Sequence, residues 1–285
     1  MGELDKDSLG KKKSIRVISI TSGKGGVGKS SILINIALTL AKKGNKVLIL
    51  DADLGLSNID VMLGVKPGRD ISHFFNGECK LKDIIVPGPY GLMLIPGGSG
   101  FSELSSLTNE QKLLLLSEVE EIEEEVDYLL IDTPAGIGQN VMFFNSCAVE
   151  VIVVVNPEPT SITDSYALIK VLSQNHNVKT FSLLINNVTT KIEAAKVYKK
   201  LSDVSERFLN ISLKFLGFLP FDRMISTSIK EQNPLMNRPS VTPYSSRLTH
   251  LCQQLERMAP EENLNGNIQF FFKRIIELSD KEISF

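Results

Sequence analysis

The amino-acid sequence predicts an α/β fold: a doubly wound, mainly parallel sheet with helices on both faces, followed by a short C-terminal amphipathic helix. Two observations lead to this expectation. Short apolar segments alternate along the chain with segments that repeat apolar residues at helical spacing. The segment Val151–Val155 is apolar throughout, which is typical of a parallel strand covered on both faces. Strands that alternate with helices form parallel sheets enclosed by those helices.

The expected elements divide the chain into four parts. Residues 1–13 form a polar N-terminal tail, 14–258 one α/β domain, 259–267 a linker and 268–285 the amphipathic segment. Strands are expected at 15–21, 46–51, 92–95, 128–132, 149–155, 180–186 and 214–218. Helices are expected at 30–43, 57–63, 70–76, 109–125, 161–174, 191–207 and 244–258.

Composition excludes several classes of protein. The chain has 285 residues, is 42% hydrophobic and carries a net charge of −2, so it can bury a large core and is not expected to bind nucleic acids in general. Its three cysteines, an odd number without C-x-x-C spacing, indicate reduced thiols. Residues 1–13 lack the apolar core of a signal peptide, and no apolar run reaches the roughly 18 residues of a membrane span. We therefore expect a cytoplasmic protein.

A glycine-rich loop follows the first expected strand. Residues 23–30 fit the pattern G-x-x-x-x-G-K-[ST], whose backbone N–H groups hold nucleotide phosphates, and the flanking strand and helix supply the context that this motif needs. Glycines let the chain pass close to phosphates because they lack a Cβ atom. Lys29 is expected to reach the β- and γ-phosphates, and Ser30 to bind Mg²⁺. The expected phosphate-binding residues are Gly23, Gly25, Gly26, Val27, Gly28, Lys29, Ser30 and Ser31.

Two aspartates, Asp51 and Asp53, stand at the end of the expected strand 46–51. Ligands of open α/β sheets bind beyond the carboxyl ends of the strands, so these side chains are placed for the site. We expect Asp51 to hold Mg²⁺ through water, and Asp53 to orient or deprotonate the attacking water. As an alternative, they are surface aspartates that cap a turn.

Asp132 ends the apolar strand 128–132 and precedes a turn that contains Pro134 and Gly136. This is a Walker B arrangement, in which the aspartate lies near Mg²⁺, usually with water between them. An apolar run that ends in aspartate is a weak signal by itself. It gains weight here because the glycine-rich loop and the paired aspartates precede it along the chain.

The second lysine of the loop, Lys24, is not needed to hold phosphates within one chain. With Lys24 included, the loop resembles the deviant Walker A motif of the MinD/ParA family of dimerising ATPases. Residues 51–58 resemble the switch I segment of this family, and residues 132–136 resemble its Walker B and switch II segment. The resemblance covers nearly all of residues 14–258.

The resemblance implies a Mg²⁺-dependent ATPase that forms a homodimer when it binds ATP. Lys24 would then cross into the partner subunit and contact its nucleotide. Lys24, Lys29 and Asp53 are therefore the expected catalytic residues, while Ser30, Asp51 and Asp132 are the expected metal site. The backbone N–H of Gly136 would sense the γ-phosphate.

Two further sites follow from the resemblance. Asn186 and Pro220 stand where the family places contacts to adenine, although asparagine also suits an ordinary turn after a strand. Helix 161–174 and the loop 157–165 would lie near the dimer surface, where regulators of relatives bind. Asp164 is the candidate contact there; the alternative is that it caps the start of the helix.

Three stretches, residues 94–100, 132–138 and 157–166, resemble the flagellar-number regulators FlhG and FleN more than the division-site protein MinD. This branch implies an ATPase switch that associates reversibly with the inner face of the cell membrane and regulates flagellar number or placement. The expected partners are an FlhF-like GTPase, flagellar switch (C-ring) proteins or a flagellar transcription regulator. The tail 1–13 lacks the activator motif that such regulators use on the GTPase.

Several alternatives stay open at this point. The chain can be a division-site ATPase, a ParA-type partitioning ATPase, or a nucleotide-gated scaffold with negligible turnover. Partitioning would call for a clear basic surface near the C-terminal end, which the near-neutral chain does not indicate. Iron-carrying relatives need paired cysteines that share a cluster, and the spacing of Cys147 and Cys252 does not provide such a pair.

The segment 268–285 carries its apolar residues on one broad stripe of a helical wheel. Bulky aromatic residues on one side and the Lys273–Arg274 pair suit a membrane interface, so we expect a peripheral membrane contact through this segment. The alternative is a helix that docks on protein. The acidic residues Glu277, Asp280 and Glu282 weaken the attraction of the segment to anionic lipid.

Overall fold

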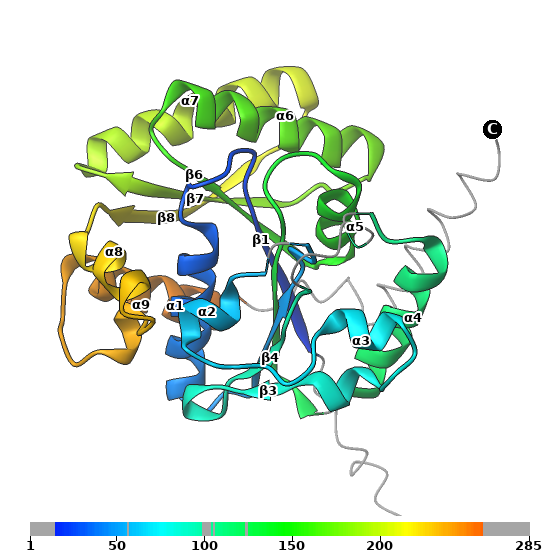
Figure 1. Ribbon diagram of the computed structural model, residues 1–285. Helices are drawn as coiled ribbons and strands as arrows, with labels where there is room; N and C mark the ends of the chain where they lie inside the picture. The colour runs from blue at the N-terminus through cyan, green and yellow to red at the C-terminus, as the bar shows by residue number, and fades with distance from the viewer. Residues whose placement is uncertain (1–14, 56, 99–103, 105, 123–124, 259–285) are drawn as a thin grey trace, which may run out of the picture.

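The computed structural model describes residues 15–55, 57–98, 104, 106–122 and 125–258. In this part of the chain, eight strands form one sheet in the order β3-β4-β2-β5-β1-β6-β7-β8 (Figure 1). All neighbouring strands are parallel except the edge strand β3, which runs antiparallel to β4. The strands are β1 (Arg16–Thr21), β2 (Val47–Asp51), β3 (Val86–Pro87), β4 (Met93–Ile95), β5 (Tyr128–Asp132), β6 (Glu150–Val155), β7 (Phe181–Val188) and β8 (Leu213–Pro220).

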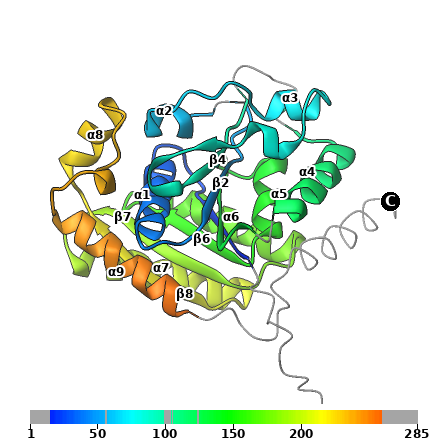
Figure 2. The same cartoon turned by 90° about the horizontal axis from the view of Figure 1, so that it is seen from below.

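Helices cover both faces of the sheet, which confirms the predicted fold class (Figure 2). Helices α3 to α7 contribute buried residues to the core on one face, and α1, α2 and α9 contribute them to the core on the other. The helices are α1 (Lys29–Lys42), α2 (Ile59–Leu63), α3 (Ile71–Phe75), α4 (Asn109–Ile122), α5 (Gln139–Cys147), α6 (Pro159–Asn175), α7 (Lys191–Leu209), α8 (Arg223–Lys230) and α9 (Pro243–Arg257).

The central strand β1 shows why the sequence forms this architecture. All six of its residues are buried, and alternate side chains enter opposite cores: Val17 the core under α3 to α7, Ile18 and Ile20 the core under α1. A strand buried on both faces needs apolar residues at nearly every position, as the sequence has them. Because β1 lies between β5 and β6, the loop after it opens where ligands bind in such sheets.

Two α-helices and one strand were not expected from the sequence. Helix α5 has eight of its nine residues buried, so it lacks the polar face by which a helical pattern is detected. Helix α8 is short, and strand β3 has two residues. The expected tail 1–13, linker 259–267 and amphipathic segment 268–285 lie outside the described residues. Within the described ranges, no helix is long and apolar enough to cross a membrane.

Candidate functional site

The glycine-rich loop connects β1 to α1 at the carboxyl edge of the sheet. Gly28 precedes α1 with φ 93°, a left-handed conformation that glycine adopts without strain. The loop therefore turns directly into the helix, and the first backbone N–H groups of α1 point back toward the loop. A helix start of this kind favours a bound anion, because its free N–H groups carry partial positive charge.

Lys29, Ser30 and Asp132 form a compact polar cluster beside this loop. The Lys29 ammonium lies 2.7 Å from one carboxylate oxygen of Asp132, and the Ser30 hydroxyl donates to the other oxygen at 2.6 Å. The two side chains of the ion pair are 10% and 3% exposed. Lys29 and Ser30, at the start of α1, thus meet Asp132 at the end of β5, although they are 103 and 102 positions away from it in the sequence. The Walker B interpretation requires this proximity.

Asp51 lies next to Asp132, because the two are register partners at the ends of β2 and β5. Its carboxylate accepts hydrogen bonds from the Ser57 hydroxyl at 2.7 Å and from the backbone N–H groups of Asp53, Asn58 and Ile59. Asp51 is 1% exposed. Burial, and then the neighbouring charge of Asp132, raise the pKa of Asp51 to about 7, against the opposing effect of its hydrogen bonds.

This raised pKa predicts a pH dependence of stability for the nucleotide-free protein. The folded state holds the Asp51 proton up to about pH 7, whereas an unfolded aspartate releases it at its ordinary pKa of 3.8. The free energy of unfolding should therefore fall as pH rises through this window, by on the order of 4 kcal/mol from this group. Denaturant titrations at stepwise pH should show that Asp51→Asn removes this slope. The exposed-site variant Asp83→Asn should keep it, and equal slopes in both variants would contradict the assignment.

Asp53 follows Asp51 in a segment that is held from two sides. Its backbone N–H donates a hydrogen bond to the Asp51 carboxylate. A Cβ atom added at Gly97 would lie only 3.1 Å from the Asp53 carbonyl oxygen, so Gly97 packs against this segment. The Ser57 N–H also points to the Gly98 carbonyl, at 3.5 Å. The loop after β4, one of the stretches that resemble FlhG and FleN, thus packs directly against the switch I segment.

Lys24 points away from the phosphate loop and pairs with the start of α6. Its ammonium lies 2.6 Å from the Glu158 carboxylate and 2.9 Å from the Thr160 hydroxyl. The side chain is 37% exposed and that of Glu158 56%, so this pair lies at the surface. The sequence placed the loop 157–165 near the dimer surface, but no local pattern connects its Glu158 and Thr160 to Lys24, which is 134 and 136 positions away.

Gly136 donates its backbone N–H to the Ser22 carbonyl at 2.9 Å, with φ 94° at the glycine. Ser22 in turn directs its hydroxyl to the Lys24 carbonyl at 2.9 Å. The switch II segment is thus bonded to the backbone of the loop that begins the phosphate site. To accept a hydrogen bond from the Gly136 N–H, a γ-phosphate would have to take the place of the Ser22 carbonyl.

A buried polar network lies behind the loop, and sequence analysis did not identify it. Asn145 of α5 donates to the Thr21 hydroxyl at 3.2 Å and accepts from the Ser19 hydroxyl at 2.8 Å. The Thr133 hydroxyl reaches Thr21 at 2.9 Å. This network ties β1, β5 and α5 together just below the site. The only sequence signal for this network was Asn145, a polar residue of α5, and the sequence pattern did not predict that helix.

Asn186 and Pro220 lie at the carboxyl ends of β7 and β8. Asn186 is 4% exposed and donates from its amide to the Val27 carbonyl at 2.8 Å. Its amide oxygen is buried and has no hydrogen-bond partner among the described residues. A buried acceptor without a partner is unfavourable, so a ligand with an N–H group would stabilise this position. The exocyclic amine of adenine is such a donor.

The first loop glycine packs directly on α6. A Cβ atom at Gly23 would lie 2.2 Å from the carbonyl carbon and oxygen of Asp164 and 2.5 Å from the Ser165 nitrogen. Helix α6 begins at Pro159 with Glu158 as its N-cap, earlier than the sequence pattern suggested. Asp164 therefore lies inside the helix, and the alternative that it caps the helix start was wrong. Its role as a regulator contact stays a prediction.

Comparison with known proteins identifies the family. A family model described as an AAA domain matches residues 15–185. The antiactivator FleN of Pseudomonas aeruginosa is 36% identical over 94% of this chain and 96% of its own length. The flagellum site-determining protein YlxH of Helicobacter pylori is 36% identical over 93% of this chain and 91% of its own length.

The chain belongs to the MinD/ParA family of P-loop ATPases. A chain of the MinC:MinD cell division complex of Aquifex aeolicus has the same fold, with a TM-score of 0.70 and 28% sequence identity. The match covers 86% of this chain and 96% of that chain. The resemblance found in the glycine-rich loop, switch I and Walker B segments is confirmed at the level of the family.

Within the described part of this MinD/ParA ATPase, Cys147 and Cys252 do not lie together as a metal-binding pair. Cys147 belongs to the core under α3 to α7 and Cys252 to the core under α1 and α9, so the sheet separates them. Burial raises the pKa of the Cys252 thiol to about 12, which makes it a poor metal ligand. Among the residues that the structure describes, no group of three or more histidine, cysteine, aspartate or glutamate side chains is arranged to hold a metal ion.

Proposed function

We propose that this protein is a Mg²⁺-dependent ATPase switch that dimerises on ATP, associates with the membrane, and regulates the number or placement of flagella. The observation that carries the proposal is the meeting of Lys29, Ser30, Asp51 and Asp132 at the start of α1. Two of these residues come from the phosphate loop, and the other two end neighbouring strands.

The donor set of this cluster suits Mg²⁺ with a nucleotide. One hydroxyl and two carboxylates are hard oxygen ligands, and Mg²⁺ is held in such sites by few protein groups together with phosphate and water. A cation at this point would also reduce the repulsion between Asp51 and Asp132, which contributes to the raised pKa of Asp51. When bound, the ion would offset negative charge on the β- and γ-phosphates.

The chain's own residues would then perform four tasks. Lys29 would exchange its Asp132 partner for phosphate oxygens, and the α1 N–H groups would hold the same anion. Asp53 would orient the attacking water. Gly136 would move its N–H from Ser22 to the γ-phosphate, so that nucleotide state changes the shape of switch II. Asn186 would accept a hydrogen bond from the adenine amine.

Dimerisation rests on Lys24, which faces the surface rather than its own phosphate loop. Its ion pair with Glu158 is exposed, and pairs of this kind contribute about 0–1 kcal/mol. The pair is therefore weak enough to open when a second nucleotide-bound subunit offers phosphate charge to Lys24. The flagellar role draws on the similarity to FleN and to the flagellum site-determining protein YlxH.

The substitution Lys24→Ala tests this function. The variant should bind ATP with about the affinity of the unsubstituted protein, because Lys29 and the loop backbone remain. It should stay monomeric with ATP and lose most of its turnover, since the lysine that completes the partner's site is missing. Light scattering with ATP measures the mass, and fluorescent-nucleotide titration measures the binding. A Lys24→Ala dimer with ATP would contradict the proposal.

Asp53→Ala is the matched variant. It should bind ATP and form the dimer, but it should fail to hydrolyse the nucleotide and so remain dimeric on vesicles. A variant that cycles on and off vesicles at the unsubstituted rate would instead favour a nucleotide-gated scaffold. The two variants together separate assembly from turnover.

A further inference from the structure

The start of α6 holds the Lys24 side chain of the same chain. The Lys24 ammonium donates to the Glu158 carboxylate at 2.6 Å and to the Thr160 hydroxyl at 2.9 Å. The backbone of Lys24 is held separately, because its carbonyl accepts a hydrogen bond from the Ser22 hydroxyl at 2.9 Å. The lysine thus has its backbone fixed in the phosphate loop and its side chain fixed on α6.

The Glu158 carboxylate binds Lys24 instead of capping its own helix. An N-cap side chain usually accepts a hydrogen bond from a backbone N–H of the first turn, and in the described part of the chain Glu158 makes no such bond. A carboxylate at this position is still favoured by the partial positive charge of the free N–H groups of the helix. Glu158 can therefore release Lys24 without becoming an uncompensated charge.

The contact between Gly23 and α6 sets the distance over which Lys24 reaches the helix. A Cβ atom at Gly23 would lie 2.2 Å from backbone atoms of Asp164, so the loop and the helix touch one residue before Lys24. Surface ion pairs are weak partly because two mobile side chains must be ordered to form them. Here backbone packing brings the two partners together before their side chains pair.

We propose that Glu158 and Thr160 restrain dimerisation by holding Lys24 in its own chain. This inference rests on the proposed function, in which Lys24 completes the nucleotide site of the partner subunit. A lysine that is paired with Glu158 cannot contact that nucleotide at the same time. Each subunit must therefore release its own pair before the dimer closes, and the two releases multiply in the dimer dissociation constant.

The exposure of the pair sets the size of this restraint. Both side chains are partly exposed, and surface ion pairs of this kind shift an equilibrium by up to about fivefold. Two pairs in a dimer then shift the dissociation constant by up to about 25-fold. Such a restraint raises the concentration at which the protein dimerises and does not prevent the dimer.

The first test measures dimerisation of the full chain with the ATP analogue ATPγS, by light scattering over a dilution series. Glu158→Gln should lower the dimer dissociation constant by about 3- to 25-fold, while the nucleotide affinity of the monomer stays the same. Thr160→Val removes the second acceptor without a change of charge and should lower the constant by a smaller factor. The double variant Lys24→Ala, Glu158→Gln should be as monomeric as Lys24→Ala, because no lysine is left to release.

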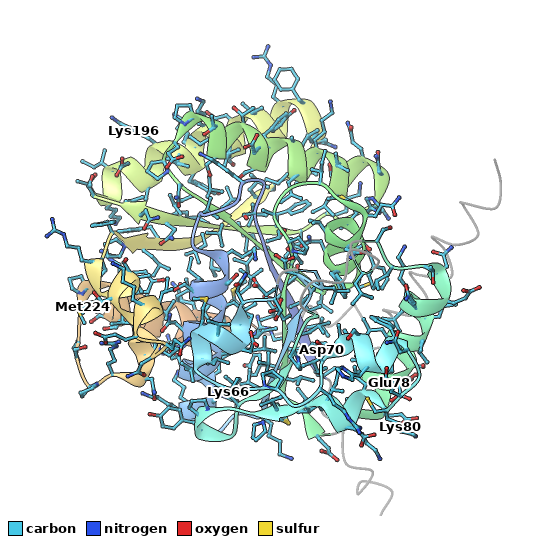
Figure 3. The ribbon with its side chains drawn as sticks, in the orientation of Figure 1. Lys66, Asp70, Glu78, Lys80, Lys196 and Met224 are labelled. Carbon is cyan, nitrogen blue, oxygen red and sulfur yellow. The ribbon has the colours of Figure 1, made fainter. Side chains whose placement is uncertain are left out.

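Glu231→Gln is the matched control. Glu231 pairs with Arg238 at 2.6 Å and is 58% exposed, against 56% for Glu158, so its substitution removes the same charge from a similar pair. It follows α8, which packs on the other core from α6 and α7; Figure 3 shows Met224 on α8 and Lys196 on α7 at opposite sides of the sheet. The control should change the dimer dissociation constant by less than about twofold.

The chemical reactivity of Lys24 tests the contact without a dimer. In the nucleotide-free monomer, the amine must leave both of its acceptors before it can react with acetic anhydride. Pulse labelling followed by mass spectrometry should show Lys24 modified at least about twofold faster in Glu158→Gln than in the unsubstituted chain. Glu231→Gln should leave this rate unchanged. Equal rates in all three proteins would overturn the proposal.

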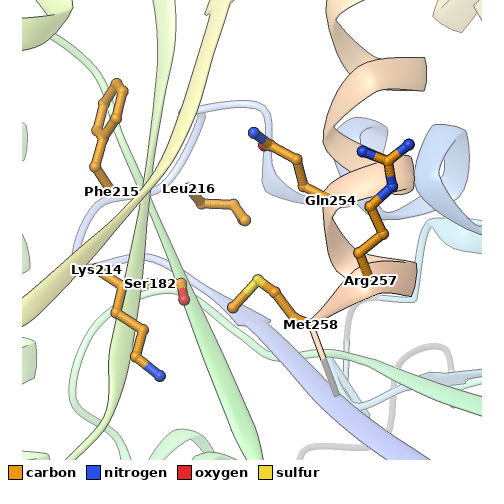
Figure 4. Close-up of a pocket in the computed structure, with 7 residues that line it drawn as sticks. All are labelled: Ser182, Lys214, Phe215, Leu216, Gln254, Arg257 and Met258. Atoms are coloured by element: carbon orange, nitrogen blue, oxygen red, sulfur yellow. The ribbon is translucent and has the colours of Figure 1, made fainter. Parts of the chain in front are cut away.

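A groove at the opposite edge of the sheet offers another surface for self-association. It has a volume of about 310 Å³ and lies between β8 and the end of α9. Figure 4 shows Leu216 and Met258 in the space between strand and helix. Lys214, at one side of the groove, stands near the start of β8, whereas the phosphate loop lies at the carboxyl ends of the strands. A dimer through this groove would be disrupted by Lys214→Glu and would not respond to changes at the start of α6.

The outcomes separate this inference from the proposed function. A Lys24→Ala chain that still dimerises contradicts the proposed function itself, and so does loss of the dimer in Lys214→Glu. If Lys24→Ala is monomeric but Glu158→Gln dimerises no more tightly than the unsubstituted chain, only the restraint is overturned. A weaker Glu158→Gln dimer would also overturn it, since Glu158 would then be a contact of the dimer. A double variant that dimerises better than Lys24→Ala would show a general charge effect in place of a released lysine.

Discussion

Replacing Lys29 by methionine should reduce ATP turnover by at least about a hundredfold, the range measured when one preorganised charge-stabilising group is removed. The ammonium is the only side-chain cation among the described residues in the cluster formed by Ser30, Asp51 and Asp132. A neutral side chain of similar length cannot offset the charge on the β- and γ-phosphates. Steady-state phosphate release measures the effect. Lys43→Met at the far end of α1 is the control and should leave turnover unchanged.

The same variant should also be less stable without nucleotide, and this second effect has its own control. Removing Lys29 leaves a buried carboxylate without its partner, which typically costs about 3–5 kcal/mol. The double variant Lys29→Met, Asp132→Asn should regain part of this loss in urea denaturation while remaining inactive. A double variant no more stable than the single one would mean that the Lys29–Asp132 pair does not set the stability of the empty site.

Replacing Gly23 by alanine should destabilise the folded protein by more than about 3 kcal/mol, and nucleotide binding should fall with it. The added methyl carbon would lie 2.2 Å from backbone atoms of Asp164, and backbone cannot rotate away as a flexible side chain can. Either the phosphate loop or α6 must move. Urea denaturation gives the loss of stability, and binding of a fluorescent ATP analogue gives the change at the site.

Gly25→Ala is the matched control for this prediction. Gly25 lies in the same loop, but a Cβ atom added there would have no atom within 4 Å. The backbone of Gly25 does not have a left-handed φ. The free energy of unfolding of Gly25→Ala should differ from that of the unsubstituted protein by less than about 1 kcal/mol. Similar midpoints for the two variants would show that the Gly23–α6 contact can relax, and would remove the reason to treat α6 and the phosphate loop as one unit.

Most of the fold could be predicted because its strands are continuous apolar runs and its helices have a polar face. The glycine-rich loop was found by its own pattern, and the register pairing of Asp51 with Asp132 follows from two strand ends being neighbours in the sheet. Helix α5 was missed for the opposite reason: eight of its nine residues are buried, so its polar residue Asn145 gave no periodic signal.

The details of the site that sequence could not provide are contacts between distant segments. Nothing near Lys24 indicates that Glu158 and Thr160 hold its ammonium, because those residues approach only when α6 packs beside the loop. The hydrogen bond from Gly136 to Ser22 is another such contact, since it depends on backbone positions rather than on side-chain chemistry. Pattern recognition identified the chemical groups, and packing determined which partner each one has in the nucleotide-free chain.

The Arg16 guanidinium donates a hydrogen bond to the Leu255 carbonyl and so joins the start of β1 to the end of α9, which has a practical consequence for labelling this protein. A label attached beside Arg16 or beside Leu255 would crowd the same part of the described structure. The loop before α9 offers a better insertion point, because Val241 is 84% exposed and the helix cap at Thr242 lies just downstream. A label inserted there would lie at the other end of α9 from the Arg16–Leu255 contact.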